Sequence, residues 1–317
     1  MPDVITFEQL PVQKDGPPFN AWGLYGDKDE LGRLNLITPE AIKRGRDEIR
    51  HGLVINLNLP LSIKSMHPER AELHHKINHR KHCNDDILTF NTQTSSQWDG
   101  FRHFPYQNFP GPGEYRFYNG LTMEEAKDPK VIRNGIQNFA DKPITSCAHL
   151  LDIPRYLARH GLPPLAPRTK STPITLDMLQ KCASEAGIQF ASGDILVLRT
   201  GWTEATIDLD DAAVQEQRKS RESCGVIQGE DVLKWHWENG IAAVVSDNPA
   251  YENFPHPNPS LHEVFLSGWG LPIGELFDLR LLAETCDRLK KWSFFFTSMP
   301  LYVEGGIASP PNAQAIL

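Results

Sequence analysis

Two helix–strand units in the second half of the chain restrict the fold more than any other feature. Thr175 is predicted to cap a helix that runs to Ala186, and SGDILVLRTGW (192–202) then gives a turn, a strand and a loop. A second helix is predicted over 229–239, and the continuous apolar run IAAVVS (241–246) follows it. An unbroken apolar run is typical of a strand that is buried on both faces of a sheet. The chain is therefore predicted to be an α/β protein.

Helix-capping residues and the alternation of apolar and polar residues predict the other helices and strands. Thr38 and Pro39 begin a helix over 39–51, and VINLNLPLSI (54–63) alternates like a strand. Further predictions are two strands, AHLLDI (148–153) and a final WSFFFTS (292–298), a helix from 278 to about 290, and a solvated loop at HHKINHRKH (74–82). Since no linker is evident, residues 1–317 are predicted to form a single domain, in which 1–84 are an N-terminal extension with a helix packed on the rest.

Charge and cysteine usage restrict the class of function. The chain has 32 Lys and Arg against 40 Asp and Glu, a net charge of −8, which opposes nucleic-acid and anionic-membrane partners. No apolar run approaches the roughly 20 residues that span a bilayer, and no signal peptide is evident. The five cysteines are scattered and odd in number, which favours free thiols and a cytoplasmic location. A small-molecule substrate is the expected partner.

The first candidate site lies in SSQWDGFRH (95–103), on a segment that the sequence suggests is irregular. Asp99 and His103 are four positions apart there. Three interpretations are open. The pair can share a metal ion, or the carboxylate can orient the imidazole for proton transfer. The third is an ordinary hydrogen-bonded pair at a strand end. Farther along, His262 and Glu275 lie in a region rich in proline and glycine. By spacing alone, these two indicate a surface histidine and a solvated glutamate.

Six segments, in order along the chain, resemble the cyclase family that includes kynurenine formamidase and isatin hydrolase. They are WGLYGDKDELGRLNLITPE, SSQWDGFRH with FYNG, SGDILVLRTGW, SDNPAYE, HEVFLSGWGLPIGE and GGIASPPN. Each motif is modest alone, but the six together cover nearly the whole length from Trp22. The resemblance implies the family's α/β architecture, a small β-barrel-like mixed sheet with flanking helices, in a homodimer or larger homo-oligomer. The apolar and aromatic residues ahead of Asp85 agree with self-association.

The resemblance also assigns site residues. In the family motif H-x-G-T-H-x-D-x-P-x-H, the first two histidines and the aspartate bind a divalent metal, and the last histidine moves protons. On this chain those positions are Gln93, Gln97, Asp99 and His103. The chain thus resembles a glutamine-bearing variant of the metal motif. Some longer members of the family also carry the T-Q-W-D-G form, so glutamine at position 97 is compatible with a branch of the family.

The family's downstream histidine and glutamate, which close the metal site or support it, correspond to His262 and Glu275. A glutamine offers a neutral amide oxygen in place of an imidazole, so the predicted ligand set Gln93, Gln97, Asp99, His262 and Glu275 favours Mn²⁺ or Mg²⁺ over Zn²⁺. The alternative is that no metal binds. In that case His103 is the base, Asp99 orients it, and the glutamines hydrogen-bond the substrate.

These assignments predict an enzyme acting on an aromatic small molecule. The first hypothesis is a hydrolase of a cyclic amide, lactone or aryl formamide, with His103 as proton shuttle and a divalent metal near Asp99. The second is a metal-free cyclase, isomerase or dehydratase of secondary metabolism that uses the same two residues, and the third is an inactive binding module. The residues expected to contact the substrate are Trp98, Phe101, Arg102, Tyr118 and Trp202. Core packing is the competing interpretation for the aromatic ones.

Overall fold

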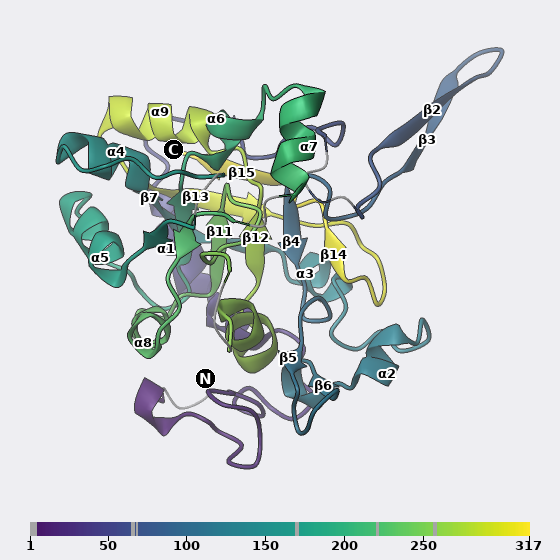
Figure 1. The fold of residues 1–317 in the computed structure, drawn as a ribbon, viewed down its shortest axis with the longest axis vertical. Coiled ribbons are helices and arrows are strands. Elements are labelled where there is room, and N and C mark those ends of the chain that lie inside the picture. Colours follow the sequence, from purple (N-terminus) through teal and green to yellow (C-terminus); the bar gives the residue numbers. More distant parts are fainter. Residues whose placement is uncertain (1–4, 65–66, 68, 169–170, 220–221, 256–258) are drawn as a thin grey trace.

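A curled mixed sheet of nine strands organises the computed structural model, which describes residues 5–317 apart from 65–66, 68, 169–170, 220–221 and 256–258 (Figure 1). The three parallel pairings join β7 to β9, β9 to β11 and β11 to β12, and the other neighbours in this sheet are antiparallel. In spatial order the strands are β1 (Val54–Asn56), β15 (Ala313–Ile316), β13 (Ser293–Ser298), β7 (Ile144–Asp152), β9 (Ile195–Arg199), β11 (Ala243–Ser246), β12 (Ile273–Glu275), β4 (Gln97–Asp99) and β14 (Ala308–Ser309). The predicted class, an α/β protein with a barrel-like mixed sheet and flanking helices, is confirmed: the sheet forms a half-barrel.

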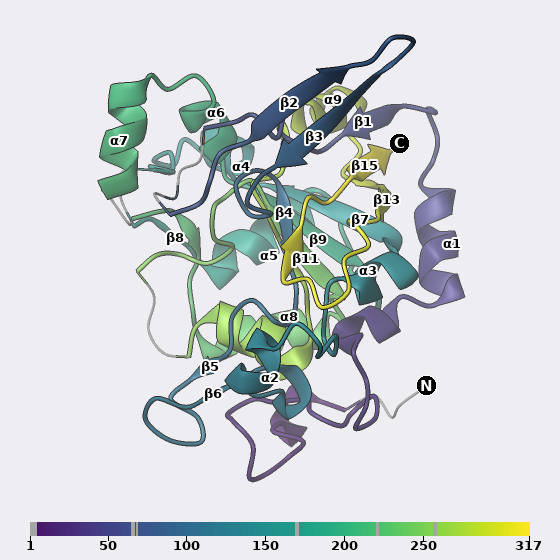
Figure 2. The same ribbon diagram turned by 90° about the vertical axis from the view of Figure 1, so that its right-hand side faces the viewer.

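Both faces of the central strands are buried, as the apolar runs predict. In β9, Leu196 and Leu198 belong to one hydrophobic cluster, whereas Ile195 and Val197 belong to the other. Helices from many parts of the chain flank the sheet (Figures 1 and 2). They are α1 (Pro39–Asp47), α2 (Met123–Lys127), α3 (Gln137–Asp141), α4 (Ile153–Arg159), α5 (Leu176–Glu185), α6 (Trp202–Thr206), α7 (Asp211–Lys219), α8 (Glu230–Glu238) and α9 (Arg280–Leu289), together with the short 3₁₀ turns η1 (Phe7–Gln9), η2 (Gly32–Leu36) and η3 (Tyr118–Gly120) and a π-helical turn η4 (Glu263–Trp269).

Helix α1 lies against β7 and β13 at very short range. A Cβ atom at Gly45 would lie 2.7 Å from the backbone nitrogen of Cys147 and 2.7 Å from the ring of Phe295. Only glycine therefore allows the helix to lie this close to the strand. The helix begins at Pro39 as predicted, with the Thr38 hydroxyl accepting from the Ala41 amide, but it ends at Asp47 rather than at residue 51.

Other sequence predictions need correction. The predicted strand over 54–63 forms a ladder only at β1, and the strand over 292–298 is not the last, because β14 and β15 follow it. The histidine-rich run expected to be a loop forms β2 (His74–His79), paired with β3 (Asn84–Thr89). The smallest sheets pair β5 (Tyr106–Gln107) with β6 (Tyr115–Arg116) and β8 (Pro173–Ile174) with β10 (Gly225–Val226). All five cysteines are free thiols as predicted, and no helix of the described residues is long and apolar enough to cross a membrane.

The β2–β3 hairpin projects away from the rest of the protein (Figure 1). Ile77 and Leu88 are 67% and 45% exposed and share one face of it, because Ile77 pairs with Asp86 and His75 with Leu88. A two-stranded hairpin is only marginally stable when it is isolated in water. Exposed apolar side chains on such an arm are compatible with the predicted self-association, which stays a prediction.

Replacing Ile77 and Leu88 together by aspartate is expected to shift the protein toward the monomer. The two charges would have to be buried in the contact between copies, which opposes association. Light scattering at micromolar concentration should give the parent a mass well above the 35.8 kDa of one chain, and the double variant a mass near that value. Ile87→Asp, on the opposite face of the hairpin, is the matched control. A monomeric parent protein would contradict the expectation.

Candidate active site

Strand β4 places two polar side chains on one face of the sheet. Gln97 and Asp99 are two positions apart on this strand, so their side chains point to the same side, and Trp98 between them points to the other. The segment expected to be irregular is therefore a strand at residues 97–99. Gln97 lies directly opposite Glu275 of β12, and its amide nitrogen donates to the Glu275 carboxylate over 2.8 Å. Strand pairing thus joins two sequence-predicted residues that are 178 positions apart.

His262 joins this group from the residue that precedes η4. Its Nε2 lies 3.1 Å from a carboxylate oxygen of Glu275 and 3.8 Å from Oδ2 of Asp99. One ligating atom from each of Asp99, His262 and Glu275 lies within 4.8 Å of the others, and all three residues are buried. The prediction of a surface histidine and a solvated glutamate, made from spacing alone, is therefore wrong. The arrangement implied by the family resemblance brings these residues to one point.

Glu252 contacts the ring nitrogen of His262 that faces away from Glu275. Sequence reasoning did not identify this residue. Its Oε1 lies 2.6 Å from His262 Nδ1 and accepts from the His262 backbone amide over 3.2 Å. A carboxylate on the far nitrogen of an imidazole fixes the ring's orientation and its tautomer, and this arrangement is common behind metal-binding histidines. Glu252 closes the SDNPAYE segment, so the motif contained it without showing its role.

The two glutamines donate to the same carboxylate. Gln93 Nε2 lies 2.7 Å from Asp99 Oδ1, and Gln97 Nε2 lies 3.3 Å from the same oxygen. Residues 93, 97 and 99 therefore converge on one point, as the family motif implies. In this orientation the amide N–H groups of both glutamines face Oδ1 of Asp99. Rotation of either amide by about 180° would present its carbonyl oxygen instead.

Two buried acceptors in the site have no hydrogen-bond partner among the described residues. They are Asp99 Oδ2 and Gln97 Oε1. Buried polar atoms are nearly always paired, so these two acceptors are available to a ligand or a water molecule. The charges agree with this interpretation: the carboxyl groups of Asp99, Glu252 and Glu275 are each at most 2% exposed and lie around the imidazole of His262. A divalent cation would relieve this concentration of buried negative charge, so the residues present fit a metal.

The buried, closely spaced carboxyl groups shift the pKa values of both His262 and Glu275. Burial and the neighbouring Asp99 raise the pKa of Glu275 to about 7, although His262 acts to lower it. Burial acts to lower the pKa of His262, but Glu252 and Glu275 outweigh it and raise that pKa well above the ordinary value. The raised pKa of His262 favours its cationic form, which lies between the carboxyl groups of Glu252 and Glu275.

His103 lies at the exposed side of the site. Its side chain is 23% exposed, whereas that of Asp99 is fully buried, and its Nε2 lies 3.7 Å from Asp99 Oδ2. Burial lowers the pKa of His103, with His262 and Arg70 acting in the same direction and Asp99 against it. The ring is therefore mostly neutral at pH 7 and can accept a proton. An imidazole that contacts both solvent and a buried carboxylate suits proton transfer.

All five residues expected to contact substrate are buried and make contacts inside the protein. Trp98 lies on the opposite face of β4 from the site, where its ring packs against Phe277 and its indole N–H donates to Ser298. The reason is strand alternation, which sends neighbouring side chains to opposite faces. Trp98 is thus a core residue, and the expectation of substrate contact is corrected.

Phe101, Arg102 and Tyr118 are also buried. Phe101 packs with Tyr118, whose hydroxyl donates to Asp29 over 2.9 Å. The Arg102 guanidinium donates to the backbone carbonyls of residues 125, 126 and 131. These contacts hold the side chains inside the protein, although Arg102 Nε has no hydrogen-bond partner among the described residues. Substrate contact at these three residues stays a prediction.

Trp202 is buried in a small cluster that includes the residue after Glu275. It packs with Leu59 and Leu276, the residue after Glu275, and its indole N–H has no hydrogen-bond partner among the described residues. Sequence reasoning missed Phe104, whose ring lies 5.6 Å from the His262 ring and 6.3 Å from the His103 ring, centroid to centroid. Phe104 directly follows His103, but nothing in the sequence pattern distinguished it from the neighbouring aromatic residues.

The fold and the site together define a class of protein: a curled α/β half-barrel with a buried Asp–His–Glu cluster at the β4–β12 pair. A family model described as "Putative cyclase" matches residues 55–253. The chain therefore belongs to this cyclase family, as the sequence motifs predicted. A search of curated proteins found no match.

Solved structures share the fold over almost the whole chain. The crystal structure of a novel cyclase is 29% identical with a TM-score of 0.83, covering 94% of this chain and 99% of that one. Isatin hydrolase A from Ralstonia solanacearum is 17% identical with a TM-score of 0.59, covering 88% and 97%. Isatin hydrolase A from Labrenzia aggregata, bound to benzyl benzoate, is 14% identical with a TM-score of 0.57, covering 85% and 94%. At these low identities, the isatin hydrolases show a shared fold.

Proposed function

We propose that the protein is a hydrolase that opens a cyclic amide, a lactone or an aryl formamide in an aromatic small molecule. The observation that carries the proposal is the convergence of Asp99, His262 and Glu275, with the unpaired Oδ2 of Asp99 facing His103. The likeness of the fold to isatin hydrolases supports a substrate of this class. Phe104 and Trp202 would provide the aromatic contacts.

Asp99, His262 and Glu275 would hold a divalent cation, with the amide oxygens of Gln93 and Gln97 as further ligands after rotation. Such an ion supplies polarisation of the scissile carbonyl and lowers the pKa of water. Oxygen-rich ligation favours Mn²⁺ or Mg²⁺ over Zn²⁺. Glu252 would keep the His262 ring oriented through its hydrogen bond to Nδ1.

His103 would move the protons. Its neutral imidazole takes a proton from the attacking water at the exposed side of the site and returns it to the leaving nitrogen or oxygen. Asp99 lies 3.7 Å from its Nε2 and stabilises the imidazolium that forms between these two steps. Both transfers use one side chain, so a single histidine suffices.

Metal analysis and activity screening test this proposal together. Purified protein would be assayed against isatin, simple lactones and aryl formamides, with and without a chelator, and after Mn²⁺ is restored. Hydrolysis that is lost with chelator and regained with Mn²⁺ supports the proposal. No hydrolysis of any member of the panel by metal-loaded protein would count against it.

A metal-free enzyme of the cyclase, isomerase or dehydratase type is the second candidate. The observation in its favour is that both glutamines donate N–H groups to Asp99, which stabilises the carboxylate without a cation. His103 would then be the base, and the cationic His262 would be the acid. Turnover that is insensitive to chelator, by protein free of metal, distinguishes this candidate from the hydrolase.

Glu252→Gln is expected to weaken Mn²⁺ binding by about 10–100-fold, because the hydrogen-bonded carboxylate behind a metal-binding imidazole orients it and raises its basicity. Electron paramagnetic resonance of free Mn²⁺ during a titration measures this. Glu263→Gln is a matched control: Glu263 is also buried, but it accepts from the backbone amides of Gln107 and Ser260 instead of contacting the site. Equal Mn²⁺ affinity in the parent and Glu252→Gln proteins would show that Glu252 does not support a metal ligand.

A further inference from the structure

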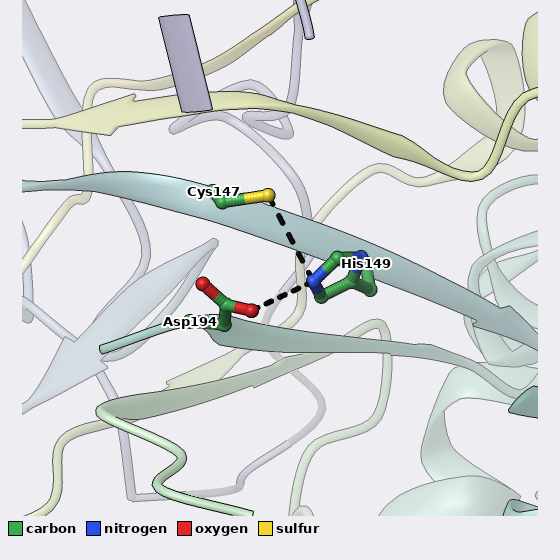
Figure 3. A group of neighbouring side chains, drawn as sticks. All are labelled: Cys147, His149 and Asp194. Carbon is green, nitrogen blue, oxygen red and sulfur yellow. Dashed lines mark hydrogen bonds and ion pairs between the residues drawn. The ribbon is translucent and has the colours of Figure 1, made fainter. Parts of the chain in front are cut away.

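A second group of ligating side chains lies on the central strand β7, away from the β4–β12 pair. Cys147 and His149 are two positions apart on this strand and point to the same side, and Asp194 lies just before the neighbouring strand β9 (Figure 3). His149 Nε2 lies 3.0 Å from Asp194 Oδ2 and 3.8 Å from Cys147 Sγ. The three residues are 2–5% exposed, and one ligating atom of each lies within 4.8 Å of the others.

The geometry excludes a proton relay of the Cys–His–Asp type. Such a relay needs the thiol on one ring nitrogen and the carboxylate on the other. Here the same nitrogen, Nε2, faces both the thiol and the carboxylate, while Nδ1 is 2.8 Å from the Ser293 hydroxyl. In addition, burial raises the pKa of the Cys147 thiol to about 12, which disfavours a free thiolate nucleophile.

Convergence of sulfur, nitrogen and oxygen on one point is the geometry of a metal site. In a tetrahedral zinc site with Zn–S of about 2.3 Å and Zn–N and Zn–O of about 2.0–2.2 Å, neighbouring ligand atoms lie roughly 3.2–3.7 Å apart. The observed separations of 3.0 Å and 3.8 Å from His149 Nε2 lie close to this range. A thiolate and a carboxylate also neutralise the two charges of the ion.

The surroundings already hold two of the ligands in position. Ser293 fixes the ring of His149 through Nδ1. Arg44 of α1 donates to Asp194 Oδ1 over 2.9 Å, which turns Oδ2 toward the imidazole, and the Ala191 amide donates to Oδ2. The Arg44 side chain is 39% exposed.

We propose that Cys147, His149 and Asp194 form a zinc site, with Asp194 binding through Oδ2 and a water or hydroxyl as fourth ligand. Thiolate and imidazole ligands select Zn²⁺ over the Mn²⁺ or Mg²⁺ suited to the oxygen-rich site at Asp99. Binding releases the thiol proton of Cys147 to solvent, because the thiolate is the ligand. The ion links β7 and β9 beneath α1, so the site stabilises the centre of the sheet.

Cobalt substitution tests the proposal, because a cobalt–thiolate bond gives an intense near-ultraviolet charge-transfer band. The titration uses a Cys83→Ser protein, since Cys83 is the exposed cysteine. One equivalent of Co²⁺ is expected to produce the band, and Zn²⁺ is expected to remove it. The additional change Cys147→Ser is expected to abolish the band, and Ser293→Ala to weaken Co²⁺ binding by about 10–100-fold through loss of the His149 contact.

Asp99→Asn with Glu275→Gln serves as the control for the other site and should leave the band unchanged. Zn²⁺ is also expected to raise the melting temperature of the Cys83→Ser protein by several degrees, and that of the Cys147→Ser variant by less. Absence of the band in folded Cys83→Ser protein, or its survival in Cys147→Ser, would overturn the proposal. If Cys147→Ser does not fold, the Ser293→Ala variant tests the proposal instead, since it keeps all three ligands. Unchanged Co²⁺ affinity in folded Ser293→Ala protein would refute the assignment.

Discussion

His103→Ala is expected to lower the turnover number by about 10²–10⁴-fold, the usual contribution of a positioned general acid–base group. The physical reason is that His103 is the imidazole at the exposed side of the site, mostly neutral at pH 7 and 3.7 Å from Asp99. Its loss removes the acceptor for the water proton and the donor to the leaving group. Steady-state kinetics on a substrate identified by the hydrolysis screen measure the effect, with KM expected to change little.

The fold must be checked beside the kinetics, since a partly buried histidine also packs. Circular dichroism and the melting temperature of His103→Ala are expected to match those of the parent, because the ring is 23% exposed and its polar contacts are with Gln93 and Asp99. His82→Ala, an exposed histidine of the β2–β3 turn, is the matched control and should retain full activity. A folded His103→Ala protein that keeps most of its turnover would show that another group moves the protons.

Gln93→His with Gln97→His is expected to raise Zn²⁺ affinity by at least about 100-fold. Four-ligand zinc sites gain about 10–16 kcal/mol, so each ligand contributes several kcal/mol, and two amides would be replaced by two imidazoles. The structure places both side chains correctly: each amide nitrogen lies within 3.3 Å of Asp99 Oδ1. Native activity is expected to fall, because the glutamines also position Asp99.

Titration calorimetry measures the affinities, and both proteins should carry Cys147→Ser so that the proposed zinc site on β7 does not contribute. Gln137→His is a matched control, since Gln137 is buried but donates to the Ile132 carbonyl, away from the Asp99 group. No gain in Zn²⁺ affinity in a folded double variant would mean that residues 93, 97 and 99 do not form a metal site, and the metal-free candidate would then be preferred.

Residue spacing in the sequence predicted only part of the candidate site. Asp99 and His103 are four positions apart, so the sequence alone identified them as a candidate pair. Asp99, His262 and Glu275 are brought together by the pairing of β4 with β12 and by the π-helical turn, and spacing alone indicated surface positions for the last two. Only the family resemblance connected them. Glu252 and Phe104 were missed because contact with an imidazole depends on tertiary packing.

The substrate-contact prediction for Trp98 failed for a related reason. An aromatic residue beside a site motif has the same sequence pattern whether it faces the site or the core. The face on which Trp98 lies depends on which strand β4 pairs with and at which register, and a shift of one residue would reverse it. The Cys147, His149 and Asp194 group was likewise undetectable, since 45 residues separate His149 from Asp194.

The sequence by itself determined the α/β class, because continuous apolar strands such as IAAVVS must be buried on both faces and the helices between them supply the cover. It also determined the start of α1 and both ends of α5 to within a residue, since capping and glycine act locally. The curl of the sheet, the partners of β4 and the polar groups that meet there were decided only by the tertiary structure. Those features depend on pairing between strands far apart in the chain, and local patterns carry no record of that pairing.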